Sequence, residues 1–196
     1  MKLLLALSRL IDRLNDLVGR GISWLILLAV LISTGNAIIR YSLNASSNAW
    51  LEIQWYLFSA VFLFGAGYTL LHNKHVRIDV VSSRLSRRAQ TWIDILGTLF
   101  FLLPMAITIM WLSWPVFVAA YERHEISGNA GGLLIWPARL MVPVGFLLLV
   151  LQGLSELIKR VAFLMDLGPD PLHTAEAPSE EELLAAEIRR QREEAA

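Results

Sequence analysis

Four long apolar segments divide the chain, and charged or turn-forming residues bound each of them. They run from about Ile22 to Ile39, Trp50 to Leu71, Trp92 to Phe117 and Trp136 to Ile158. An apolar run of roughly 20 residues is what a helix needs to cross a hydrocarbon layer about 30 Å thick. The pattern therefore predicts an all-α membrane protein whose four transmembrane helices occupy residues 21–165. We expect the third and fourth helices to bend, because prolines lie inside both.

The two ends of the chain show different patterns. In residues 1–20 the leucines recur on one helical face and most charged residues lie elsewhere, which predicts an amphipathic helix lying in the membrane interface. The leucines are Leu3, Leu7, Leu10, Leu14 and Leu17. Residues 166–196 open on the helix-breaking run Gly-Pro-Asp-Pro at 168–171 and are rich in charge. They are predicted to form a mobile cytoplasmic tail.

Basic residues predict the orientation, because Lys and Arg accumulate in the cytoplasmic flanks of transmembrane helices. They precede the first span, follow the fourth, and cluster between the second and third as Lys74, Arg77, Arg84, Arg87 and Arg88. Both termini are therefore predicted to be cytoplasmic, and in a bacterium the connections around Asn44 and Ser127 would face the periplasm. The same cluster of five is expected to contact anionic lipid headgroups.

Composition excludes several functions. The chain carries 17 basic and 17 acidic residues and no cysteine, which gives no electrostatic case for nucleic acid and rules out disulfides, thiolate catalysis and iron–sulfur clusters. His72 and His75 are three residues apart beside cations, and a metal site needs more ligands than two. Neither a phosphate-binding glycine loop nor a nucleophile motif is present. These residues therefore give no support for a metal site, phosphate binding or nucleophilic catalysis.

Glu52 is the anomaly of the second span, because a carboxylate at membrane depth is by default a functional or assembly residue. At helical spacing it shares a face with Tyr56, Ser59 and Ala66, and small residues on such a face let another helix approach closely. This favours Glu52 as a contact to a helix or a loop. The alternative is a fully hydrated carboxylate at headgroup level.

Asp94 and Glu156 lie near the cytoplasmic ends of their spans, where Arg88, Lys159 or Arg160 could pair with them. No series of carboxylates crosses the membrane, so a proton path through this chain alone is not supported.

The connection before the fourth span, within Tyr121–Phe146, is rich in glycine and polar residues. Glu125, Ser127 and Asn129 suit a surface that another protein touches. A simple flexible loop fits the same residues equally well.

Three local patterns resemble one family, the small DctQ-type membrane subunit of tripartite ATP-independent periplasmic (TRAP) transporters. They are WLEIQWYLF at 50–58, HNKHVRIDVV at 72–81, and EISGNAGGLLIWPARLMVPVGFLLLVLQGLSELIKR at 125–160. The order and spacing of these patterns cover most of the region from Ile22 to Arg160. The third pattern is most similar to the branch that carries carboxylates or keto acids.

This resemblance implies a non-enzymatic scaffold subunit in the bacterial inner membrane, without a cofactor of its own. A periplasmic binding protein would deliver an organic acid to a large elevator-type membrane subunit, which moves it inward with sodium bound in that large subunit. Glu52, Tyr56, Ser59 and Ala66, together with Glu125, Ser127 and Asn129, would then be candidate partner contacts. Two rival hypotheses are an autonomous homo-oligomeric channel or exporter with Glu52 as its ion site, and a haem-binding oxidoreductase subunit.

Overall fold

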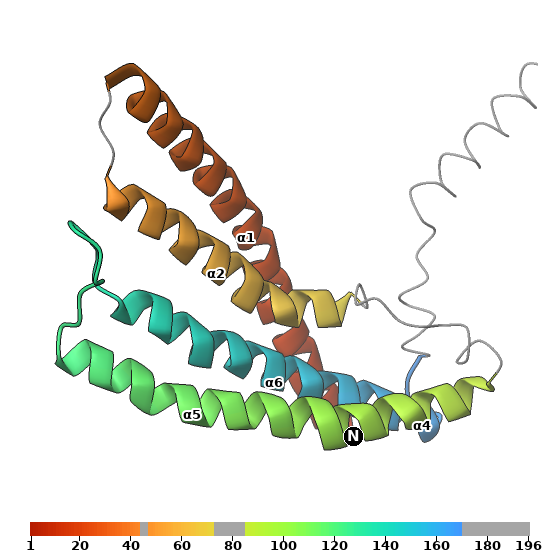
Figure 1. Ribbon diagram of the computed structural model, residues 1–196. Coiled ribbons are helices and arrows are strands. Elements are labelled where there is room, and N and C mark those ends of the chain that lie inside the picture. Colours follow the sequence, from red (N-terminus) through yellow and green to blue (C-terminus); the bar gives the residue numbers. More distant parts are fainter. Residues whose placement is uncertain (44–46, 73–84, 170–196) are drawn as a thin grey trace, which may run out of the picture.

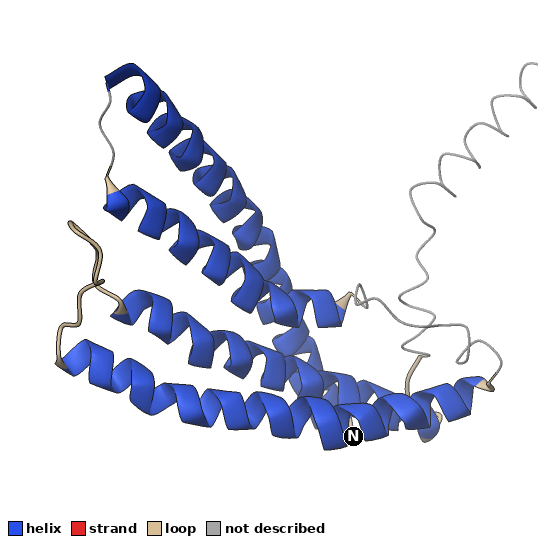
Figure 2. Ribbon diagram, viewed as in Figure 1, coloured by secondary structure: helices blue, strands red, loops and turns tan. Residues whose placement is uncertain are grey.

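The computed structural model describes residues 1–43, 47–72 and 85–169. Figure 1 shows a fan of helices, and Figure 2 shows that short connections make up the rest of the described chain. The helices are α1 (Lys2–Leu43), α2 (Asn48–Leu71), α4 (Arg87–Gly97), the π-helical turn η1 (Thr98–Leu102), α5 (Leu103–Glu122) and α6 (Trp136–Leu164). α4, η1 and α5 together form one stretch of 36 residues.

Four of these stretches are long and apolar enough to cross a membrane, which confirms the predicted fold class. The lipid contacts expected of Lys74, Arg77 and Arg84, and the predicted tail beyond residue 169, lie outside the described residues. The C-terminal ends of α1 and α5 lie at the same end of the fan as the N-terminal ends of α2 and α6 (Figure 1). We call this the loop end.

α1 is a single helix of 42 residues that includes both the predicted interfacial segment and the first predicted span. At 1.5 Å per residue it is about 63 Å long, roughly twice the thickness of a hydrocarbon layer. In Figure 1 it crosses behind the other helices. Leu3 and Leu17 are 83% and 71% exposed, whereas Ser8 and Asn15 are buried. The first part of α1 therefore turns polar residues toward the protein and leucines outward.

α6 is the central helix, because it packs against α1, α2 and α5. Leu149 and Val150 of α6 form the apolar core with Leu103 and Ala106 of α5, and Ala66 of α2 packs against this core. α2 also packs against α1, so α1, α2 and α6 each contact the other two helices of this group.

Two glycines allow the helices to approach closely. A Cβ atom on Gly145 of α6 would lie 2.7 Å from the Leu63 Cβ and 2.9 Å from the Leu63 carbonyl oxygen of α2. A Cβ atom on Gly67 of α2 would lie 2.2 Å from the Asn15 Oδ1 of α1. Close packing of this kind is the main force between helices in lipid, where apolar burial gives no preference.

The stretch from α4 to α5 stays continuous across Pro104. Proline has no N–H to donate to the carbonyl four residues earlier, and its ring crowds that carbonyl. The chain widens by one turn of π-helix, in which the Leu103 N–H donates to the Thr98 carbonyl oxygen. Figure 1 accordingly shows a gently bowed helix without a break.

Candidate functional site

Glu52 binds the loop that connects α5 to α6. Its Oε1 accepts hydrogen bonds from the Ser127 hydroxyl and, at 2.8 Å, from the Asn129 Nδ2. Its Oε2 accepts one from the Leu133 backbone N–H at 2.7 Å. Glu52 is 5% exposed. Because no Lys or Arg of the described chain pairs with it, hydrogen bonds rather than a cation stabilise this carboxylate.

Two more side chains of α2 hold the same loop. The Asn48 Nδ2 donates to the Ala130 carbonyl at 3.0 Å, and the Tyr56 hydroxyl donates to the Leu134 carbonyl at 3.0 Å. These residues lie four positions before and after Glu52, so all three project from one face of α2. The first turns of α2 therefore carry the loop. We call Glu52 with Ser127, Asn129 and Leu133 the Glu52 cluster.

The loop is shaped so that its donors converge on Glu52. The Ser127 N–H donates to the Leu133 carbonyl at 2.9 Å, which closes a short turn between them. Gly131 in that turn has a φ angle of +72°, a conformation that glycine adopts without strain. The turn thereby presents one hydroxyl, one amide and one backbone N–H to the same carboxylate.

Glu125 forms a second link at the base of the loop. Its two carboxylate oxygens accept hydrogen bonds from Arg139 at 2.5 and 2.7 Å, the bidentate geometry that suits a guanidinium. Both side chains are about one third exposed, so this link contributes less than its geometry suggests. It joins the end of α5 to the first turn of α6.

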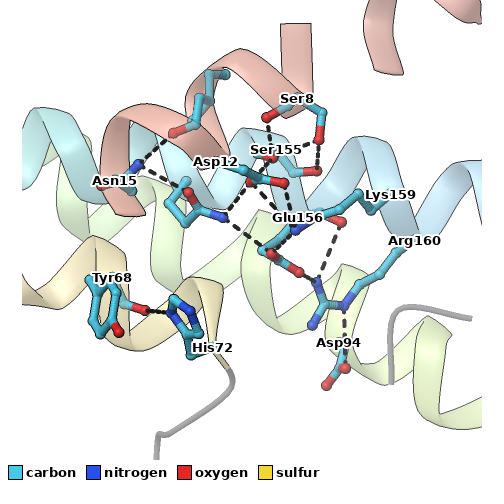
Figure 3. Close-up of polar contacts among 12 residues, drawn as sticks. Ser8, Asp12, Asn15, Tyr68, His72, Asp94, Ser155, Glu156, Lys159 and Arg160 are labelled. Atoms are coloured by element: carbon cyan, nitrogen blue, oxygen red, sulfur yellow. Dashed lines mark hydrogen bonds and ion pairs between the residues drawn. The ribbon is translucent and has the colours of Figure 1, made fainter. Parts of the chain in front are cut away.

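A network of polar side chains joins α1 to α6 at the other end of the bundle (Figure 3). The Asn15 Nδ2 donates to the Gln152 Oε1 at 3.0 Å, and the Asp12 Oδ1 accepts from the Gln152 Nε2 at 2.9 Å and from the Ser155 hydroxyl at 2.7 Å. Ser8 also shares a hydrogen bond of 2.7 Å with Ser155. α6 therefore supplies most of the hydrogen-bond partners for the polar face of the first part of α1, although the buried Asn15 Oδ1 accepts no hydrogen bond from the described residues.

Charged side chains extend this α1–α6 network toward α4. The Glu156 carboxylate pairs with both Lys159 and Arg160, and the Arg160 Nε lies 3.3 Å from the Asp94 carboxylate (Figure 3). Glu156 and Arg160 are each 2% exposed. The predicted pairing of Asp94 and Glu156 with nearby basic residues is confirmed, and Lys159 also reaches Asp12 at 3.3 Å.

The structure divides the predicted partner contacts into three groups. Glu52, Ser127 and Asn129 bind one another, and Tyr56 holds the same loop. Glu125 pairs with Arg139 instead.

Ser59 and Ala66 form the third group. Ser59 is partly buried on α2, and Ala66 packs against the core of α5 and α6. Of the predicted lipid contacts, Arg87 and Arg88 are exposed, and Arg88 lies 3.3 Å from Asp166.

The part of the network on α1 was not predicted from the sequence. Ser8, Asp12 and Asn15 are spaced four and three residues apart, so they share one face of α1. Gln152, Ser155, Glu156 and Lys159 repeat the same spacing on α6. The sequence therefore did contain a signal for this contact: two polar stripes with the same spacing, one near the N-terminus and one inside the fourth apolar span.

These features define a helical multi-pass membrane protein whose polar groups bind one another at the two ends of the bundle. The family model for the DctQ component of tripartite ATP-independent periplasmic transporters matches residues 10–163, most of the 196 residues. The chain belongs to this family, and it is a transporter component rather than an enzyme. Neither a curated protein nor a solved structure was found to match the chain.

Proposed function

We propose that this chain is the scaffold subunit of a sodium-coupled TRAP transporter in the bacterial inner membrane. It supports a large elevator-type subunit, which binds the sodium ions and moves an organic acid, a carboxylate or keto acid, delivered by a periplasmic binding protein. Both termini lie in the cytoplasm, and the loop end faces the periplasm. Sodium coupling, substrate class, partners and orientation all come from the family resemblance and from the distribution of basic residues.

The distribution of charged residues along the bundle is the observation that supports the scaffold role. Within the described helices, charged side chains occur at the two ends of the bundle, and the core between them is the apolar set Leu103, Ala106, Leu149 and Val150. An ion crossing such a core would meet no carboxylate among the described residues, and an ion without ligands at that depth is strongly disfavoured. This supports transport by the partner rather than by this chain.

Co-expression with the large subunit of a TRAP transporter tests the proposal. We expect the two chains to co-purify from detergent and to take up an organic acid in proteoliposomes only with sodium and the binding protein present. Recovery of this chain solely as a homo-oligomer, or transport by the purified chain alone, would contradict the scaffold role and favour an autonomous channel.

A further inference from the structure

The first part of α1, residues 2–20, presents an apolar row of side chains on its outer side. Its polar row, which includes Ser8 and Asn15, is bound to α6. Five leucines point away from the bundle, and each is at least 42% exposed. This leucine row consists of Leu3, Leu7, Leu10, Leu14 and Leu17.

The structure sorts the charged residues of this segment by sign. Both acids form ion pairs, Asp12 with α6 and Asp16 within α1. Lys2, Arg9 and Arg13 are exposed, and none of the three pairs with an acid in the part of the chain that the structure describes. The protein therefore uses the negative charges of the segment itself and leaves three positive charges to its surroundings.

The free cations lie in one row beside the leucine row. Lys2, Arg9 and Arg13 are spaced seven and four residues apart, or about two turns and one turn, so they share one helical face. This basic row is about a quarter of a turn from the centre of the leucine row. Long basic side chains in such a position cover apolar neighbours with their methylene groups and keep the charge in a polar layer.

The length of α1 allows this segment to lie near the membrane surface. Residues 22–43 are about 33 Å long, which is enough to cross a hydrocarbon layer of about 30 Å. α1 also crosses the other helices obliquely (Figure 1). The leucine row can therefore reach acyl chains while the basic row stays at the level of the headgroups.

We propose that the first part of α1 is a binding surface for anionic phospholipid, with Lys2, Arg9 and Arg13 at the headgroups and the leucine row among the acyl chains. The inference is independent of the proposed function, because it concerns lipid and not the transport partners. A zwitterionic lipid would cover the leucines but would bring no net charge to the three cations. An anionic lipid supplies both the apolar surface and the charge that such a helix requires.

The lipid composition next to α1 tests the proposal. The chain has no cysteine, so Leu10→Cys gives a single thiol for a fluorophore, at a position that is 64% exposed. The whole 196-residue chain is reconstituted in phosphatidylcholine vesicles that contain a minor fraction of a quencher-labelled lipid. We expect labelled phosphatidylglycerol to quench more strongly than labelled phosphatidylcholine at the same fraction. The excess should disappear when salt rises from about 0.1 M to about 1 M, because salt screens exposed charges.

Arg13→Gln tests the basic row, because it removes one free cation within a turn of the label. We expect the preference for phosphatidylglycerol to fall about twofold to fivefold, the effect of one basic residue at an anionic surface. Arg40→Gln is the matched control, since Arg40 is exposed on the same helix but lies at the loop end. It should leave the preference unchanged.

Three results would overturn the proposal. Equal quenching by the two lipids would show that the surface does not select anionic headgroups. Weak quenching by both would show that protein covers the leucine row. An equal fall with Arg13→Gln and Arg40→Gln would show that net charge, and not the basic row, attracts the lipid.

Discussion

Gly67→Ala should destabilise the bundle, because the added methyl group meets a side chain that cannot move away. The new Cβ would lie 2.2 Å from the Asn15 Oδ1 and 3.3 Å from the Leu148 carbonyl oxygen. Asn15 is fully buried, and its Nδ2 donates to Gln152 at 3.0 Å and to the Ile11 carbonyl at 3.3 Å. Relief of the clash therefore requires either a shift of α2 or loss of the Asn15–Gln152 hydrogen bond.

Two costs and one gain contribute to the change in the free energy of unfolding. Overpacking a close contact costs about 1–3 kcal/mol, and an interhelical hydrogen bond in a membrane protein contributes roughly 0.6 kcal/mol more. The higher helix propensity of alanine offsets about 1 kcal/mol of this. We expect Gly67→Ala to lower the free energy of unfolding by about 0.5–2.5 kcal/mol.

Gly65→Ala is the control on the same helix, since a Cβ atom there meets nothing within 4 Å. It should leave stability unchanged or raise it by up to about 1 kcal/mol. Reversible unfolding in mixed micelles, followed by tryptophan fluorescence, measures both variants. If Gly67→Ala proves as stable as Gly65→Ala, the close approach of α1 to α2 at Asn15 is not a feature of the folded protein.

The remaining predictions concern the Glu52 cluster, the α1–α6 network and an exposed ion pair of α1. Glu52→Leu should increase hydrogen exchange of the Leu133 amide and weaken recovery of the large subunit; a loosened loop with unchanged recovery would show that the loop is not a partner surface. Glu156→Ala should lower the free energy of unfolding by about 3–5 kcal/mol, because it leaves Arg160 buried with one carboxylate partner fewer. Arg20→Ala removes only an exposed ion pair and should change stability by less than about 1 kcal/mol, as thermal unfolding in detergent would show.

The sequence was sufficient for the elements whose signal is local. Long apolar runs predicted four membrane-crossing helices, and the position of Asp94 and Glu156 near basic residues predicted their ion pairs. Glu52 could be recognised as unusual for the same reason, since a carboxylate inside an apolar run is costly wherever the helix packs.

The partners of Glu52 could not be predicted, because they depend on how helices far apart in the chain align. Ser127 and Asn129 are 75 and 77 residues from Glu52. Their donors converge on Glu52 only once α2 and α6 lie side by side with a fixed offset, which close contacts such as Gly145 against Leu63 determine. From the sequence, the polar loop residues suited a partner surface and an internal contact equally well.

The first part of α1 shows a related difficulty. In water, the leucines would indicate the buried face, whereas next to lipid the same pattern leaves the polar face to pack against protein. The structure places Ser8 and Asn15 against α6 and turns Leu3 outward. Hydrophobic periodicity therefore identified the helix but could not reveal that its polar stripe is a helix–helix contact.

The two polar clusters together explain how a small helical unit could act as a fixed support. One joins α2 to the loop before α6, and the other joins α1 and α4 to α6, so each end of the central helix is bound to its neighbours by hydrogen bonds. Because the charged residues of the described helices lie at the two ends of the bundle, its middle can offer a partner an apolar surface without burying charge. Shape complementarity then remains as the means of recognition at that depth.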